Sequence, residues 1–185
     1  MYQYLTADLH FNHKNIIDFS NRPFKDTESM NKTLINNINE MCKKEDILYN
    51  LGDFMFKKSS QAEVYNREPE KLLNPKIIHI KGNHDRKNYS KGMLDLAFIT
   101  YAKTKYLFCH IPPTSKDSGP LVKSLSLQAD CILCGHVHSA WKTKIFDYYI
   151  DNYLLKSVPI INVGVDVWNY RPVRMDKIHN LYLKQ

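Results

Sequence analysis

The chain has 185 residues and a formal net charge of +7, which suits one domain with its own core, and we expect a single domain over residues 1–185. It lacks an apolar run of about 18 residues and opens without the pattern of a signal peptide, so membrane-spanning and exported classes are excluded and a soluble, cytoplasmic protein is expected. The positive charge favours anionic partners, but the basic residues are scattered, so composition alone does not identify a nucleic-acid binder.

Apolar runs with the character of strands recur along the chain. In order they are YQYLTA (2–7), DILYNL (46–51), KIIHI (76–80), KYLFC (105–109), DCILC (130–134) and PIINVGV (159–165). Since strands and helical stretches alternate, the pattern predicts an α/β fold with helices covering the sheet faces.

Three stretches between these runs favour helices. Residues 28–44 carry apolar side chains at helical spacing. A second helix is predicted to begin at Ser60 with a capping box to Glu63, and Pro69 is expected to end or kink it. The third covers residues 120–129, with proline in the first turn.

Four cysteines are too few for a disulfide scaffold and fit a reducing compartment. Cys131 and Cys134 form a C-x-x-C inside an apolar run. We interpret them as small buried residues rather than a redox pair.

Polar side chains that can bind a metal follow five of the six apolar runs. These are Asp8 and His10, then Asp53, then Asn83 and His84, then His110, then His136 and His138. One such pair alone would be an ordinary turn. Because loops at the carboxyl ends of strands in an open α/β sheet line a common crevice, five of them predict a shared site.

The motifs DLH (8–10), GDF (52–54), GNHD (82–85), CH (109–110) and GHVH (135–138) together resemble the calcineurin-like metallophosphoesterase superfamily. DLHFNHKNII, NRPF (21–24) and INVGVDVWNYRPV (161–173) resemble its small bacterial and phage members, whose natural substrates are generally unassigned. The resemblance implies a four-layer αββα sandwich, in which two mixed β-sheets pack face to face and are flanked by helices.

The resemblance also implies two sets of metal ligands. One ion would be held by Asp8, His10, Asp53 and His138, and the other by Asp53, Asn83, His110 and His136. A carboxylate is suited to bridging two ions, and we assign that role to Asp53. Mixed imidazole and oxygen ligands favour Mn²⁺, with Fe, Zn²⁺, Ni²⁺ or Co²⁺ as alternatives, over Mg²⁺ and Ca²⁺.

The expected reaction is hydrolysis of a phosphate ester by a metal-bridging hydroxide. His84 is assigned as the general acid that protonates the leaving oxygen. Asp85 is assigned to orient His84, and the alternative that it only closes its turn stays open.

Weaker signals mark residues that could contact substrate, each with an ordinary structural alternative. Asn12 shares the first loop, and His13 is either a contact or the polar start of a helix near Lys14. Arg22 and Arg171 have the donor geometry for phosphate, although most arginines lie on surfaces. Trp168 and Tyr170 could stack a nucleobase, but covering the core is preferred.

The function expected is a phosphodiesterase or phosphatase acting on nucleotides or other small phosphate esters. Processing of nucleic-acid ends is a substrate variant of this hydrolase. A non-catalytic scaffold of the same fold is the alternative from another class. The sequence does not determine the oligomeric state.

Overall fold

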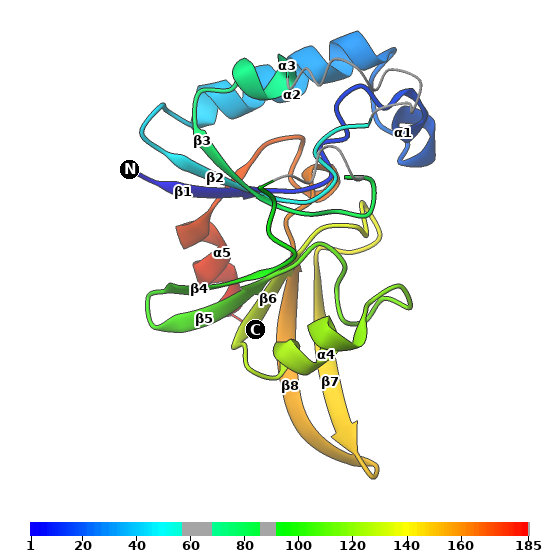
Figure 1. The fold of residues 1–185 in the computed structure, drawn as a ribbon, viewed down its shortest axis with the longest axis vertical. Coiled ribbons are helices and arrows are strands. Elements are labelled where there is room, and N and C mark those ends of the chain that lie inside the picture. Colours follow the sequence, from blue (N-terminus) through cyan, green and yellow to red (C-terminus); the bar gives the residue numbers. More distant parts are fainter. Residues whose placement is uncertain (57–67, 86–91, 185) are drawn as a thin grey trace.

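The structure is a computed structural model that describes residues 1–56, 68–85 and 92–184. It contains two mixed β-sheets (Figure 1). The first has the order β3 (Lys76–Ile80), β2 (Ile47–Leu51), β1 (Gln3–Thr6) and β9 (Val173–Arg174). Strands β1, β2 and β3 are parallel, and β9 pairs antiparallel with β1.

The second sheet has five strands. Their order is β4 (Ala97–Tyr101), β5 (Thr104–Phe108), β6 (Cys131–Cys134), β8 (Tyr153–Asn162) and β7 (Thr143–Ile150). The three central strands β5, β6 and β8 are parallel, while β4 and β7 pair antiparallel at the two edges.

Helices lie on the outer faces of both sheets, and the last helix lies between the two sheets (Figure 1). They are α1 (Lys14–Phe19), α2 (Thr27–Met41), α3 (Glu68–Lys71), α4 (Pro120–Ser126) and α5 (Met175–Tyr182). The buried face of α2 packs on the first sheet, and α4 packs on the outer face of the second. Helix α5 contributes Met175 and Ile178 to the core between the sheets.

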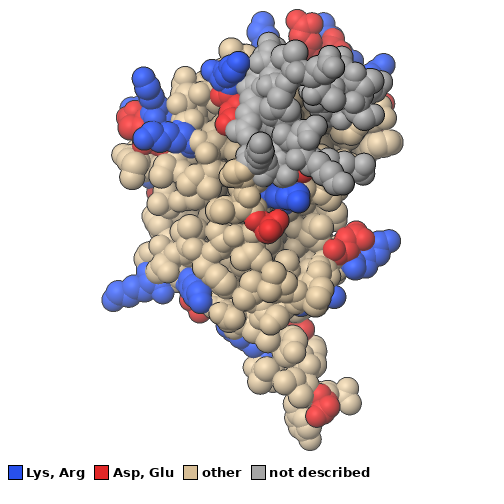
Figure 2. All heavy atoms as spheres, viewed as in Figure 1, with Lys and Arg blue, Asp and Glu red and all other residues tan. Residues whose placement is uncertain are grey.

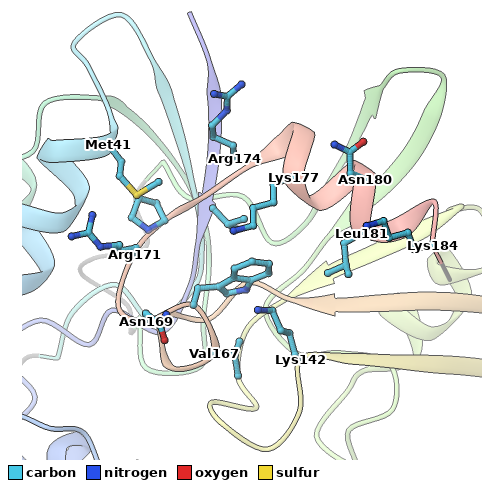
Figure 3. A pocket seen from close by; sticks show the side chains of 13 residues that line it. Met41, Lys142, Val167, Asn169, Arg171, Arg174, Lys177, Asn180, Leu181 and Lys184 are labelled. Atoms are coloured by element: carbon cyan, nitrogen blue, oxygen red, sulfur yellow. The ribbon is translucent and has the colours of Figure 1, made fainter.

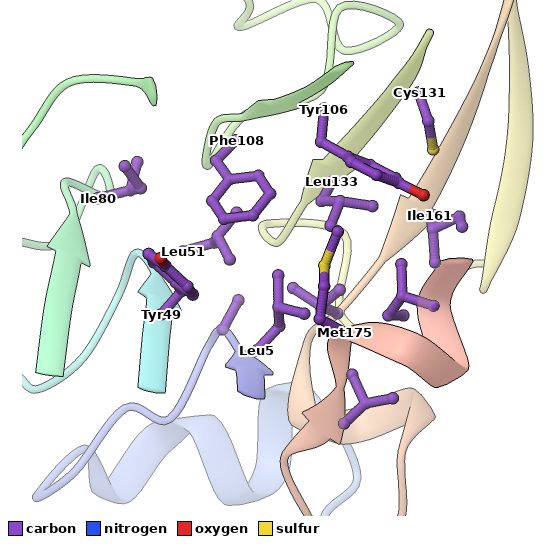
Figure 4. Packing of buried hydrophobic residues seen from close by; sticks show 14 residues of the cluster. Leu5, Tyr49, Leu51, Ile80, Tyr106, Phe108, Cys131, Leu133, Ile161 and Met175 are labelled. Atoms are coloured by element: carbon purple, nitrogen blue, oxygen red, sulfur yellow. The ribbon is translucent and has the colours of Figure 1, made fainter. Parts of the chain in front are cut away.

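The main core lies between the two sheets. Leu5 and Leu51 of the first sheet meet Phe108 and Leu133 of the second in one buried cluster (Figure 4). Successive side chains in a strand point to opposite faces, so Tyr4 faces the α2 layer instead. Because the central strands are buried on both faces, their sequences are apolar runs without polar alternation. The four-layer αββα sandwich with two mixed sheets is confirmed.

The same alternation places the two cysteines of the C-x-x-C motif on opposite faces of β6. Cys131 lies in the core between the sheets, whereas Cys134 lies in the cluster under α4. Both are buried free thiols, which confirms their interpretation as small buried residues.

Most predicted elements are present, and three strands were missed. The run 159–165 supplies only the end of the longer β8, and β4, β7 and β9 were not predicted. The predicted helix 28–44 is α2, and the predicted helix 120–129 is α4 with Pro120 as its first residue. The predicted helix start at Ser60 lies outside the described residues, and Pro69 is found in α3.

In residues 1–56, 68–85 and 92–184, no helix has both the length and the apolar composition that a membrane span requires.

The two sheets meet where β1 and β8 end. Ala7 forms a parallel bridge with Gly164, and the Val165 amide donates to the Ala7 carbonyl at 3.1 Å. The loops that follow the parallel strands of both sheets therefore lie at one common edge of the molecule. This edge carries the polar residues singled out from the sequence.

Candidate metal centre

Asp53 stands at the centre of the polar cluster. Its Oδ2 lies 3.5 Å from Nε2 of His10 and 3.2 Å from Nε2 of His110. Its Oδ1 accepts a hydrogen bond from the His84 amide at 2.9 Å. One carboxylate thus joins the loops that follow β1, β3 and β5, which is the position expected of a bridging ligand.

The second group of predicted ligands gathers on Asn83. Its side-chain oxygen lies 3.0 Å from Nε2 of His110 and 3.0 Å from Nδ1 of His136. Nδ1 of His110 lies 2.8 Å from the Leu51 carbonyl, to which an Nδ1–H donates, and this contact turns Nε2 toward the cluster. Asp8 joins the group because its carboxylate accepts from the His136 amide at 2.9 and 3.0 Å.

The donor set fits a divalent cation. Two groups of side chains each have their ligand atoms within 4.8 Å of one another. One group is Asp8, His10 and His138, and the other is Asp8, Asp53 and His110. Nε2 of His10 is buried and has no hydrogen-bond partner among the described residues. A buried ring nitrogen without a hydrogen-bond partner is costly, and a cation could accept its lone pair when that nitrogen carries no proton.

Backbone strain is concentrated at the same residues. Asp8, His10, Asp53, His136 and His138 have φ values of 56°, 49°, 53°, 73° and 46°. Left-handed conformations cost a non-glycine residue about 1–2 kcal/mol each, so the surrounding structure must hold them. Backbone hydrogen bonds hold two of these residues: the Asp8 amide donates to the Gly52 carbonyl, and the His10 amide donates to the Asp53 carbonyl.

Two glycines allow the loops to approach closely. A Cβ on Gly82 would collide with the carboxylate and the amide of Asp53. A Cβ on Gly135 would stand 2.6 Å from the Ala7 Cβ and 2.8 Å from Oδ2 of Asp8. The glycines that precede Asn83 and His136 are therefore required by contact with the carboxylates.

Burial and charge act in opposite directions within the cluster. Burial raises the pKa of Asp8 and lowers the pKa of His10 to about 2, so the His10 imidazole is neutral at pH 7. Burial would also lower the pKa of His110, but the hydrogen bond and charge of Asp53 outweigh it and raise this pKa to about 9. The same pairing holds the pKa of the Asp53 carboxyl below its usual range, although burial opposes it.

Asp166 belongs to the site and was not among the predicted residues. Its Oδ2 lies 2.9 Å from Nδ1 of His138, and both of its oxygens accept from the Arg22 guanidinium at 2.9 Å. The signal was present in the sequence, because Asp166 directly follows the sixth apolar run. A carboxylate behind a ligating histidine fixes which ring nitrogen faces the metal.

Arg22 is not placed to contact a phosphate, which corrects the expectation from sequence. Its side chain is fully buried. Besides Asp166, its N–H groups reach the carbonyls of Asp8 at 2.7 Å and Leu9 at 3.2 Å, and the Met30 sulfur at 3.6 Å. Because all of its N–H groups already have partners, Arg22 stabilises the conformation of the loop that follows β1.

His84 stands at the exposed rim of the cluster. Its ring centroid lies 5.2 Å from that of His10 and 5.7 Å from that of His13. Asp85 is buried, and its carboxylate accepts from the amides of Gly82 and Asp53 at 2.8 Å and of Phe54 at 3.2 Å. These are the contacts of a residue that closes a turn, the alternative that the sequence left open.

The remaining predicted contacts divide between two places. His13 is buried beside the cluster, with its Nδ1 3.1 Å from Nδ1 of His10, and it also precedes α1. Asn12 is exposed in the same loop, and its side chain accepts from Asn31 at 2.6 Å. Arg171 instead lines a separate pocket (Figure 3) and pairs with Glu40 at 3.0 Å.

Comparisons with known proteins agree with this geometry. Residues 1–167 match the family model described as the calcineurin-like phosphoesterase superfamily domain. An uncharacterized protein of Methanocaldococcus jannaschii is 38% identical over 182 residues, which cover 98% of this chain and 91% of that protein. The crystal structure of a protein of unknown function from Aquifex aeolicus superposes with a TM-score of 0.71 at 23% identity, covering 97% of this chain and 98% of the other. That structural similarity shows the shared fold.

Proposed function

Because the chain belongs to the calcineurin-like phosphoesterase superfamily, we propose that it hydrolyses phosphate mono- or diesters with the help of two divalent cations. The observation that carries the proposal is the convergence of loops from both sheets on Asp53, beside a buried His10 nitrogen that lacks a hydrogen-bond partner among the described residues. Nucleotides and other small phosphate esters are the proposed substrates.

The ligands proposed for the first cation are Asp8, His10, Asp53 and His138, and for the second Asp53, Asn83, His110 and His136. Mn²⁺ is the first candidate for this mixture of imidazole and oxygen donors. When bound, such cations supply hydroxide at neutral pH and positive charge for the phosphoryl oxygens.

The chain itself supplies the proton for the leaving group. His84 is exposed at the rim, and its amide bond to Asp53 fixes its loop against the cluster. We assign its imidazole as the donor to the departing ester oxygen. Asp85 supports this role indirectly, since its bonds to Gly82, Asp53 and Phe54 hold the turn that carries His84.

The test compares metal content and hydrolysis in the wild type, Asp53→Asn and His84→Ala. With Mn²⁺ present, Asp53→Asn is expected to lose bound metal and to lower kcat/KM on p-nitrophenyl phosphate and bis(p-nitrophenyl) phosphate by on the order of 100-fold or more. Asp95→Asn is the matched control, because Asp95 is an exposed aspartate between β3 and β4. It should retain both metal and activity.

His84→Ala separates proton donation from metal binding. It is expected to keep its metal and to lose about 10²–10⁴-fold in kcat on an alkyl ester, and much less on a p-nitrophenyl ester, because nitrophenolate leaves without a proton. Equal losses on both esters would contradict the acid role of His84. A wild-type protein that binds Mn²⁺ yet hydrolyses neither ester would favour the scaffold alternative.

A further inference from the structure

A pocket lies between the segment 167–172, β9 and α5 (Figure 3). Its volume is about 590 Å³, which is within the usual size of small-molecule sites. Its cationic lining residues are Lys142, Arg171, Arg174, Lys177 and Lys184. Among the described residues that line it there is no aspartate or glutamate, and none of the proposed metal ligands.

The positive charge of this pocket is only partly neutralised. Arg171 pairs with Glu40, and Arg174 pairs with Asp176, both outside the lining. Within the described ranges the three lysines have no carboxylate partner. The pocket therefore has an excess of cationic side chains around a concave surface, which attracts anions.

Trp168 brings two of the lysines together. Its Nε1 donates to the Asn162 carbonyl at 2.8 Å, which fixes the plane of the indole. Nζ of Lys142 lies 3.6 Å from the ring centroid and Nζ of Lys177 lies 5.5 Å from it. Two ammonium groups thus share one ring, and burial together with the charge of Lys177 lowers the pKa of Lys142. An anion bound in the pocket near these ammonium groups would offset their repulsion.

We propose that this pocket binds the phosphate group of a nucleotide-sized phosphorylated molecule, with Lys142 and Lys177 contacting the phosphate. The rest of the ligand would lie against the apolar side chains of Met41 and Leu181 and the amide of Asn180 (Figure 3). The site is separate from the metal cluster, so it goes beyond the proposed function and does not depend on it.

The test uses Trp168 as the reporter. The chain has two tryptophans, so in a Trp141→Phe background the indole signal comes from Trp168 alone. The full chain, stripped of metal and checked for its fold by circular dichroism, is titrated with adenosine 5′-monophosphate, inorganic phosphate and adenosine. We expect saturable fluorescence changes with the two phosphates and none with adenosine.

Charge variants then locate the binding. Lys142→Gln and Lys177→Gln should each weaken adenosine 5′-monophosphate about tenfold, since a bond to a charged group is lost. Lys177→Arg should restore most of the affinity. Lys144→Gln is the matched control, because Lys144 is exposed on β7 outside the pocket lining.

Three results would overturn the proposal. They are the absence of a saturable signal together with no heat of binding in wild-type protein, equal affinity for adenosine and its monophosphate, and unchanged affinity in both glutamine variants. Asp53→Asn should bind the nucleotide normally in this assay. A failure of hydrolysis and a failure of this pocket are therefore distinguishable.

Discussion

Asp166 is a buried carboxylate between a histidine and an arginine. Burial alone would raise its pKa, but the hydrogen bond from His138 and the charge of Arg22 outweigh burial and lower it. The carboxylate therefore stays ionised at neutral pH and holds Nδ1 of His138, which leaves Nε2 of that ring for the cluster. Arg22 also donates to the carbonyls of Asp8 and Leu9. The Arg22–Asp166 ion pair therefore positions two predicted ligands, Asp8 and His138.

Asp166→Asn should weaken metal binding as well as folding. Mn²⁺ affinity is expected to fall about 10–100-fold, because His138 loses the partner that fixes its ring. The free energy of unfolding should drop by about 3–5 kcal/mol, because the buried guanidinium of Arg22 loses its counter-charge. Isothermal titration with Mn²⁺ measures the first effect and urea unfolding the second.

The control for this variant is Asp176→Asn, which removes the partner of Arg174 at the surface. An exposed pair contributes about 0–1 kcal/mol, so stability should change little and Mn²⁺ affinity should not change. If Asp166→Asn destabilised the protein but bound Mn²⁺ as tightly as wild type, Asp166 would have only a structural role.

The contrast between Asp166 and Arg22 shows what sequence can predict about single residues. Asp166 follows an apolar run, as the predicted ligands do, so its position near the site could have been predicted from the sequence. The role of Arg22 was not, because its partner lies 144 residues away along the chain. Only the packing of β1 against the end of β8 brings the two together.

The loop after β3 depends on a close contact between two backbones. Gly82 sits directly against Asp53, with no room for a side chain. Its amide also donates to Asp85, which in turn accepts from the Asp53 amide. The turn that carries Asn83 and His84 is therefore packed onto the turn after β2.

Gly82→Ala should disturb this contact. An added methyl group must push the two loops apart, which typically costs about 1–3 kcal/mol of unfolding free energy in a packed region. Mn²⁺ affinity should fall as Asn83 moves away from Asp53. Thermal unfolding and metal titration are the measurements.

Gly119→Ala provides the matched control for the same change. Gly119 has a φ of −70°, and an added Cβ would meet nothing within 4 Å. This variant should bind Mn²⁺ like wild type and should lose at most about 1 kcal/mol of unfolding free energy, because Gly119 is the N-cap of α4 and alanine is less favourable there. A Gly82→Ala protein that behaved the same way would show that the loops tolerate separation.

The strands that sequence predicted and those it missed differ in burial. Strands β1, β2, β5 and β6 are predicted well because nearly all of their residues are buried, which makes these runs largely apolar. Strand β7 is mostly exposed on both faces, so its sequence has neither a continuous apolar run nor a clean alternation. Strand β9 has two residues, too few for any periodic signal.

The whole molecule divides into a packed sandwich and a projecting hairpin. The tip of the β7–β8 hairpin extends beyond the other strands of the second sheet (Figure 1) and leaves Tyr153 80% exposed and Leu154 55% exposed. On the face shown in Figure 2, basic side chains are spread among neutral ones, as the sequence indicated. The concentration of lysines around Trp168 is a local exception that depends on the fold.

The proposed ligands come from both sheets, so bound metal should stabilise the sandwich as a unit. Asp8 and Asp53 follow strands of the first sheet, whereas His110 and His136 follow strands of the second. Unfolding separates these loops and destroys the cluster. Metal binding must then add to the free energy of unfolding by linkage.

Mn²⁺ at 100 times its Kd is expected to raise the free energy of unfolding by about 2.7 kcal/mol per site, measured by urea unfolding with and without the ion. Asp53→Asn should show little of this gain. Leu154→Ala, a change on the exposed hairpin, should keep all of it. The gain should vanish when a chelator removes the ion. If Mn²⁺ left the stability of the wild type unchanged, the carboxylates and imidazoles at this edge would not hold a cation across the two sheets, and the hydrolytic role proposed for them would lose its basis.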